Sequence, residues 1–403
     1  MRGVGAVPLP PVLIKHGGGI MLRYILRRLG QIVITLFIFL TLVYFLLEAQ
    51  PGDYAQTFLS NPKLTKEQRE ALKAQFGLDR PLWERYLRYM SSLFRGNLGI
   101  SFEYYPRPVV SIIAERAPRT ILLFLTAQIL SFLLGFSAGK VLAWKRGQTF
   151  EYVLTIGGVT LYTVFTPWFG LMMIWIFAYI LHLFPVGKFV TPTLWRGAPV
   201  DANYVFIRIL LSAFVASLVL FLVLLATRRL NLALRRGLRG AGILIILAGL
   251  LAYWLPSGIT RYALDILYHL ILPVMTLTLI NFAGMMLLTR NSMLETMRED
   301  FVMAARAKGL PEGVIRDKHV ARNAMLPVIT SFIFSIAFVL DGGVITETVF
   351  SWPGMGLTLL EAALSQDIPM VMGGLVFTGI LALLGHLVAD ITYAYLDPRI
   401  RYT

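Results

Sequence analysis

Apolar runs of membrane-spanning length recur along the whole chain, and they restrict its fold more than any other feature. A run of about 20 apolar residues crosses a bilayer as an α-helix, because each backbone polar group must find its partner within the segment. The chain is 57% hydrophobic and 15% charged, with a mean hydropathy of +0.70, which excludes a soluble protein of 403 residues. We predict an all-α polytopic protein of the cell membrane with about eight transmembrane helices, at about 32–47, 120–144, 152–183, 205–227, 243–255, 267–288, 326–340 and 371–393.

Basic residues at the ends of these runs predict which side of the membrane each turn faces. Arg27 and Arg28 precede the first run, Lys145 and Arg146 follow the second, and an arginine-rich turn at 228–239 follows the fourth. Because cytoplasmic loops carry an excess of Lys and Arg, we expect these turns and both termini in the cytoplasm. The formal net charge of +15 is then expected to face anionic lipid and no nucleic acid, since the arginine-rich turn has no aromatic side chains on which bases could stack.

The chain divides into three parts by composition. Residues 1–20 carry Pro and Gly clusters without a sustained period, which predicts a disordered N-terminal extension, and Met21 is a second candidate for the start. Residues 21–118 hold the first transmembrane helix and a polar segment that we expect outside the cytoplasm. Residues 119–403 form the main transmembrane domain, which includes an apolar helical hairpin at about 205–255.

A cytoplasmic loop at about 291–325 contains the only long charged stretch in the second half of the chain. It has the pattern of two helices joined at Gly309, which lacks a Cβ and can close a helix in the left-handed conformation. Pro311 opens the second helix, where its missing N–H has no intrahelical partner to lose. We predict that another protein binds here, because small residues let a helix enter a groove closely while cations pair with acidic residues at its rim. The candidate residues are Ala304, Ala305, Arg306, Lys308, Gly309 and Leu310.

Two interruptions of the apolar runs are candidates for the lining of a pathway. Pro167 and Trp168 lie inside the third run, where a proline frees a backbone carbonyl; such a break either lines a pathway or is absorbed by packing, and the sequence favours neither. Trp352 and Pro353 lie between the last two runs, in a segment too polar for a lipid-exposed span. Irregular backbone at membrane depth is tolerated only against protein or water, so we expect the leading part of this segment to dip toward the pathway.

The sequence lacks the side-chain patterns of catalysis and of cofactor binding. It contains no cysteine, which excludes disulfides, thiolate metal sites and cysteine nucleophiles. The stretch GFSAGKV at 135–141 lacks the spacing and the hydroxyl of a phosphate-binding loop. The five histidines have no carboxylate cluster at ligand spacing, and the middle of the predicted spans is nearly uncharged. We predict no catalytic residue, no metal and no cofactor, and an energy source outside this chain.

Six collinear segments resemble one known family. They are MLRYILRRLGQ from Met21, AQPGD, FGLDRPLWERYLRYMSSLFRGNLGISF, ARAKGL, VFSWPGMG and the C-terminal YLDPRIRY. Together they resemble the inner-membrane permease subunits of ATP-binding-cassette importers, in the dipeptide, oligopeptide and nickel class. The resemblance covers nearly the whole chain from Met21. In this family the cytoplasmic loop is called the EAA loop, and it inserts a short helix into a groove on the ATPase subunit.

The resemblance implies partners and assigns the loop a role. The implied partners are a second homologous permease subunit, two ATP-binding subunits and an extracytoplasmic solute-binding protein. Ala304, Ala305 and Gly309 match the small residues of the EAA loop, whereas Met303 stands where the family usually has glutamate. The family usually has about six spans, so we expect the hairpin at about 205–255 to be an insertion whose even number of crossings preserves the topology.

The function expected from the resemblance is import of peptides or similar solutes, driven by ATP on partner subunits. Two alternatives stay open on the residues alone. One is a secondary transporter or channel that works without an ATPase, and the other is a membrane enzyme, which the missing catalytic cluster disfavours. The spans do not distinguish peptides from oligosaccharides or nickel chelates, because selection in this family lies mostly in the binding protein.

Overall fold

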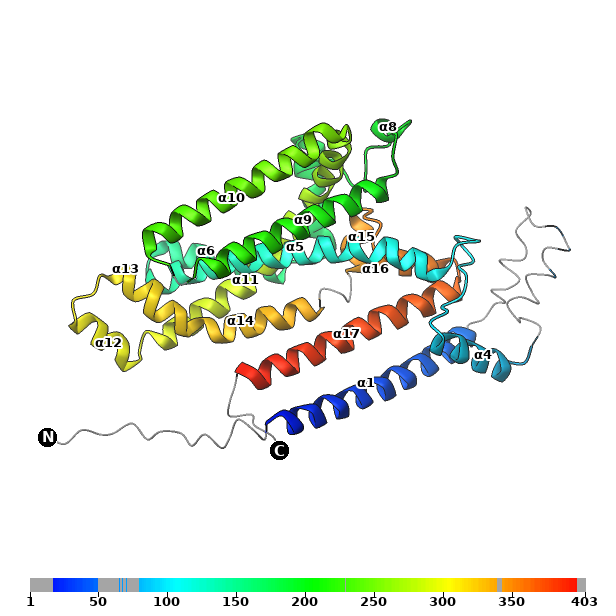
Figure 1. Cartoon of the computed structure of the whole chain (residues 1–403), viewed down its shortest axis with the longest axis horizontal. Coiled ribbons are helices and arrows are strands. Elements are labelled where there is room, and N and C mark those ends of the chain that lie inside the picture. The colour runs from blue at the N-terminus through cyan, green and yellow to red at the C-terminus, as the bar shows by residue number, and fades with distance from the viewer. Residues whose placement is uncertain are drawn as a thin grey trace. The chain divides into compact units, whose positions relative to one another are not determined.

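The computed structural model describes residues 17–49, 80–228, 230–338 and 343–396, with isolated positions 65, 67 and 70 (Figure 1). Within these residues the ordered elements are helices, and an isolated antiparallel bridge joins Ile100 to Pro108. Most of the predicted N-terminal extension, residues 1–16, lies outside the described residues. The first helix, α1 (Gly17–Glu48), begins four residues before Met21.

Long apolar helices dominate the described part of the chain. Seven of its helices are long and apolar enough to cross a membrane, and a bent pair adds an eighth crossing if it counts as one span. The predicted all-α polytopic fold is therefore confirmed. The seven are α1, α5 (Val109–Trp144), α9 (Ala202–Ala226), α10 (Leu232–Trp254) with η3 (Leu255–Ser257), α11 (Thr260–Thr296), the helix that runs from α13 (Glu312–Val314) through η4 (Ile315–Val320) into α14 (Ala321–Phe338), and α17 (Ile368–Leu396).

The bent pair is the predicted third span. Helices α6 (Thr149–Thr163) and α7 (Thr166–Met173), the latter continued by the π-helical η2 (Ile174–Ile180), meet at an angle of 107°. Val164 and Phe165 are extended between them, with ψ angles of 142° and 110°. Pro167 then lies in the first turn of α7, where its lost N–H costs no helical hydrogen bond. The sequence was right to predict a break here, and the break lies just before the proline.

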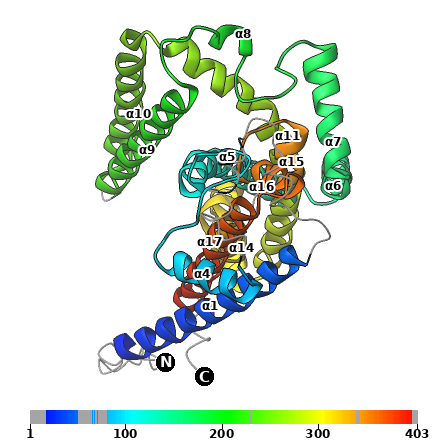
Figure 2. The ribbon, with the colours of Figure 1, turned by 90° about the vertical axis from the view of Figure 1, so that its right-hand side faces the viewer.

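The described helices fall into two compact units. The first contains α1, α4 (Leu82–Phe94) and α17. Helices α1 and α17 lie side by side (Figures 1 and 2), and at Gly379 an added Cβ would approach Leu36 to 3.1 Å. Helix α4 packs on α1, where the hydroxyls of Tyr86 and Thr41 are 2.7 Å apart. The core of this unit is Leu40, Tyr44, Met90, Met372 and Val376.

The second unit is a bundle around α11. The apolar segment of α11 is 61% buried, the largest share among the spans in the described residues. Helices α6, α7 and α9 pack against it. Helix α5 approaches it closely at Gly135 and Gly139, where an added Cβ would lie 2.6 Å from the Cβ of Met285 and 2.5 Å from that of Thr289. Small residues four apart let two helix backbones come together within a membrane. Buried residues of this core include Leu123, Val205, Phe206, Tyr262, Ile266, Leu270 and Trp352.

The predicted hairpin is present as α9 and α10, which lie beside each other (Figures 1 and 2). The arginine-rich turn is shorter than expected, because α10 begins at Leu232 and most of that stretch is helical. Leucine, alanine and arginine are strong helix formers, so the charge pattern marked the turn while propensity extended the helix. Val205 and Phe206 of α9 are fully buried in the bundle core, whereas most of both helices is exposed within the chain.

Candidate functional site

The predicted two-helix loop forms an elbow of α12 (Asp300–Ala307), a turn at Gly309, and the long helix that starts at Glu312. Gly309 has a φ of +70°, the left-handed conformation predicted for it. Its N–H donates to the Arg306 carbonyl at 2.9 Å, and the Leu310 N–H donates to the Ala305 carbonyl at 3.3 Å, which closes α12. Pro311 directly precedes the second helix, and its carbonyl accepts from the N–H of Val314 at 2.9 Å.

One face of the elbow is packed into the transmembrane bundle. Val302 and Ala305 of α12 share a buried cluster with Ile315 and Val320 of the second helix. The same cluster contains Ala143 near the end of α5 and Met293 near the end of α11, with Phe136, Trp144, Leu294, Met297 and Leu310 around them. Both helices of the elbow are thus joined to α5 and α11 by apolar contact.

The opposite face of the elbow is exposed. Four of the predicted residues lie on it or at the turn: Ala304, Arg306, Lys308 and Gly309. Met303 is 66% exposed and Phe301 38% exposed, and they give the face an apolar component. Ala305 is buried and Leu310 half-buried, so these two predicted residues face the bundle instead.

Ion pairs brace the elbow. The Arg306 guanidinium Nε lies 3.0 Å from the Glu312 carboxylate across the Gly309 turn. The Lys140 ammonium of α5 lies 3.3 Å from the Asp317 carboxylate, which Arg316 also contacts at 2.8 Å. Exposed pairs of this kind contribute at most about 1 kcal/mol to stability, so the elbow depends mainly on its apolar packing for stability.

The four predicted pathway residues lie on α7 and in the α15–α16 connection. Trp168 is 53% exposed at the start of α7, next to Pro167. Trp352, between α15 (Val344–Val349) and α16 (Met355–Leu364), is fully buried. Its indole N–H donates to the Arg119 carbonyl at 3.2 Å, and Pro353 presents its carbonyl to Arg116 at 3.5 Å. Trp352 therefore anchors this segment to α5, and a role of these residues in a pathway stays a prediction.

A buried carboxylate that the sequence did not single out holds the same segment. Glu347 of α15 is fully buried and accepts a hydrogen bond from the Thr120 hydroxyl of α5 at 2.6 Å and from the Leu357 N–H at 2.9 Å. Thr120 in turn accepts from the Met355 N–H at 2.7 Å. A Cβ at Gly354 would lie 2.2 Å from the carboxylate, so the glycine is required for this contact. Burial raises the pKa of Glu347. The only sequence signal was an acidic residue shortly before the WPGMG turn.

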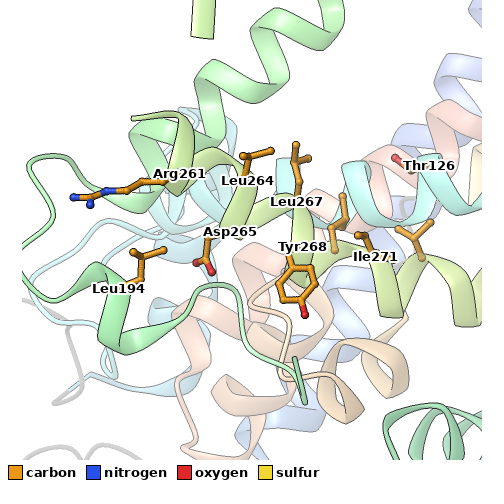
Figure 3. A pocket seen from close by; sticks show the side chains of 10 residues that line it. Thr126, Leu194, Arg261, Leu264, Asp265, Leu267, Tyr268 and Ile271 are labelled. Carbon is orange, nitrogen blue, oxygen red and sulfur yellow. The ribbon is translucent and has the colours of Figure 1, made fainter. Parts of the chain in front are cut away.

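A cavity of about 670 Å³ lies in the second unit (Figure 3). Leu264, Leu267, Tyr268 and Ile271 line it along α11, with Thr126 from α5 and Leu194 from α8 (Pro192–Trp195). Most of its lining is apolar, and Arg261 lies at one end of the row of side chains in Figure 3.

The carboxylate of this cavity, Asp265, is already engaged by the chain itself. It accepts from the N–H of Thr191 at 2.9 Å, from the Thr191 hydroxyl at 2.6 Å and from the Trp195 indole at 2.8 Å. It therefore fastens α8 to α11. The sequence contained a signal that was missed, namely an ionisable residue at the edge of an apolar run, four residues before His269.

Two family models match this chain, and together they cover most of it. Residues 131–402 match the family described as binding-protein-dependent transport system inner membrane component, and residues 21–124 match the N-terminal part of such components. The dipeptide transport system permease protein DppB of Escherichia coli K12 is 32% identical over 383 residues, covering 95% of this chain and 99% of that protein. The oligopeptide transport system permease protein AppB of Bacillus subtilis is 29% identical, covering 95% and 100%. The di/tripeptide transport system permease protein DppB of Pseudomonas aeruginosa is 31% identical, covering 95% and 99%.

Proposed function

This chain belongs to the family of binding-protein-dependent transport system inner membrane components, and from that premise we propose that it forms half of the translocation pathway of an ATP-driven importer for di- and oligopeptides. The names of its relatives, which are dipeptide, di/tripeptide and oligopeptide permeases, support peptides as the solute. The proposed partners are a second homologous permease, two ATP-binding subunits and an extracytoplasmic solute-binding protein. The chain supplies the path, and the ATP-binding subunits supply the energy.

The elbow is the observation that carries this proposal. Its inner face is packed against the ends of α5 and α11, and its outer face exposes small, apolar and basic side chains. An ATP-binding subunit that grips the outer face would move the elbow as a rigid lever and reorient the two spans. The coupling residues on this proposal are Ala304, Arg306, Lys308 and Gly309, with Ala305 and Leu310 securing the lever to the bundle.

The test is peptide uptake into proteoliposomes that contain the full chain with its partner permease, ATP-binding subunits and binding protein. Gly309→Pro removes the N–H that closes α12 and forbids the positive φ, so we expect ATP-driven uptake to be abolished. Gly313→Ala is the matched control, because Gly313 has no positive φ and an added Cβ there meets nothing within 4 Å. Normal uptake and assembly with Gly309→Pro would refute the coupling role.

Two further measurements separate the alternatives. Proteoliposomes that hold this chain without any ATP-binding subunit should show no uptake, and uptake there would make it a secondary transporter. Analysis of the ligand that co-purifies with the binding protein should find peptides. An oligosaccharide or a nickel chelate would overturn the proposed solute and leave the coupling mechanism intact.

A further inference from the structure

Arg208 of α9, which lies near the rings of Tyr204 and Tyr253, joins α9 to α10 at the end of the hairpin away from the arginine-rich turn. The Nε of Arg208 donates to the hydroxyl of Tyr253 at 2.7 Å. The guanidinium carbon lies 4.9 Å from the centre of the Tyr253 ring and 5.5 Å from that of Tyr204. In the described part of the chain the terminal nitrogens of Arg208 make no hydrogen bond or ion pair. The hydrogen bond to Tyr253 and the two nearby rings position the guanidinium and leave its terminal N–H groups available to a ligand.

Arg208, Tyr204 and Tyr253 are called the arginine clamp below. An apolar groove of about 390 Å³ runs between α9 and α10 from this clamp. Tyr253 belongs to both the clamp and the groove, and small residues such as Ala216 and Gly249 open the space. The lining from Leu211 to Val219 on α9 corresponds to about 12 Å of helix at 1.5 Å per residue. That length is close to half of the roughly 30 Å hydrocarbon thickness of a bilayer, which is the depth of one leaflet.

The groove closes toward the arginine-rich turn. A Cβ on Gly242 of α10 would lie 2.9 Å from a methyl carbon of Val223 on α9, so the helices touch there. The groove between α9 and α10 therefore has Arg208 at one end, an apolar lining along its length, and helices in contact at its other end.

The hairpin carries cations without counter-ions of its own. Between Asp201 and Asp265 the sequence has no acidic residue, and it has seven arginines, at positions 208, 228, 229, 235, 236, 239 and 261. A negative group that meets Arg208 must therefore come from another part of the protein or from the membrane. Phosphate is the anion whose geometry suits the fork of an arginine, and tyrosines concentrate at the membrane interface where lipid phosphates lie.

We propose that the hairpin binds one phospholipid of the leaflet that surrounds the start of α9, with the lipid phosphate on Arg208 and one acyl chain in the groove between α9 and α10. The charged end, the groove length and the absence of counter-ions each fit this occupant. The proposal is independent of peptide import, because it concerns the hairpin alone.

The experiment measures binding of phosphatidylglycerol with 16- and 18-carbon chains to the purified full chain in detergent, by native mass spectrometry. We expect one tightly held molecule per chain in the wild type. Arg208→Gln should weaken its binding by roughly tenfold or more, as for one lost charge-assisted hydrogen bond. Arg236→Gln, an exposed arginine at the other end of the same hairpin, is the matched control and should retain the lipid. Ala216→Phe fills the groove and should weaken binding while Arg208 is intact.

Two competitors separate the parts of the ligand. Diacylglycerol has the chains without the phosphate, and glycerophosphoglycerol has the headgroup without the chains; neither should displace the lipid as well as phosphatidylglycerol does. Equal retention by wild type and Arg208→Gln, no retained lipid in the wild type, or equal displacement by diacylglycerol would overturn the proposal. Size-exclusion profiles monitor folding of each variant, and Arg208→Lys, which keeps the cation, should recover part of the binding of Arg208→Gln.

Discussion

Glu347 shows how much of the second unit depends on one side chain. Its carboxylate is fully buried, and donors reach it from α5 and from the start of α16. Without the carboxylate, the buried Thr120 hydroxyl and the half-buried Leu357 N–H would lose their acceptor, and an unsatisfied buried group costs about 1–3 kcal/mol. The α15–α16 segment therefore owes its position to a small set of polar contacts as well as to Trp352.

Thr120→Val should destabilise the chain by about 1–3 kcal/mol, because it leaves the Met355 N–H unpaired and takes a donor from Glu347. Thr120→Ser, which restores the hydroxyl, should recover most of the loss. Thr155 is the matched control, since its buried hydroxyl has no hydrogen-bond partner among the residues that the structure describes, and Thr155→Val should cost nothing or stabilise. Thermal unfolding in detergent, followed by tryptophan fluorescence, measures all three. Equal effects of the two valine substitutions would contradict the argument.

Glu347 also gives stability a defined pH dependence. Burial raises the pKa of its carboxyl, so the folded chain holds the proton more tightly than the unfolded chain. Its contribution to stability is therefore fully present below the ordinary glutamate pKa of about 4.3 and is lost as the pH rises through the raised pKa. The unfolding midpoint of the wild type should fall more steeply with pH above about 4 than that of Glu347→Gln, which cannot titrate. Parallel midpoint curves for the two proteins would show that this carboxyl does not titrate differently on folding.

At the scale of the element, α12 is a short helix with one face in the bundle and one face in solvent. The adjacent alanines Ala304 and Ala305 lie on opposite sides of that division, the first exposed and the second only 5% exposed. A helix places successive residues about 100° apart, so neighbours in the sequence can have unrelated environments. On the proposed coupling role, the inner face of α12 secures the elbow to the bundle and the outer face contacts the ATP-binding subunit.

We therefore expect substitutions at the two alanines to have different effects, one on stability and one on binding of the ATP-binding subunits. Ala305→Leu adds volume to a packed cluster and should destabilise the chain by about 1–3 kcal/mol. Ala304→Leu should leave stability within about 0.5 kcal/mol of the wild type, since it changes an exposed position. It should nevertheless weaken co-purification of the ATP-binding subunits, because a larger side chain hinders entry into a groove. If the Ala304→Leu variant assembles and transports normally, the outer face of α12 is not the surface that binds the ATP-binding subunits.

At the scale of the whole molecule, the bilayer determines the topology of the chain, which no single contact shows. The spans must alternate in direction, and the basic turns predict which ends lie in the cytoplasm. On this topology the arginine-rich turn and the elbow are on one side, and the segment that carries α8 is on the other. Both termini are then cytoplasmic, which stays a prediction.

The absence of cysteine makes that topology directly measurable, because any thiol introduced is the only one in the chain. Arg196→Cys, near α8, should react with a membrane-impermeant maleimide on intact cells. Arg236→Cys and Lys308→Cys should react only after the membrane is opened. All three positions are exposed arginines or lysines, so they are matched in accessibility. Labelling of position 308 in intact cells would place the elbow outside the cytoplasm and contradict its proposed contact with ATP-binding subunits.

The presence of seven or eight apolar spans, the break beside Pro167 and the left-handed turn at Gly309 were predictable from sequence, because hydrophobic length, proline and glycine act within a few residues of themselves. The ends of several spans were not predicted, since α5 begins at Val109 and α10 at Leu232, about eleven residues earlier than expected in each case. Only the tertiary structure decided that Ala305 faces the bundle while Ala304 does not, that Trp352 is buried, and that Glu347 and Asp265 fasten distant segments. Thr120 and Glu347 are 227 positions apart, and no local pattern records which of the many hydroxyls a buried carboxylate will meet. A local rule fixes where helices form, whereas the partners of polar groups depend on which helices the folded chain brings together.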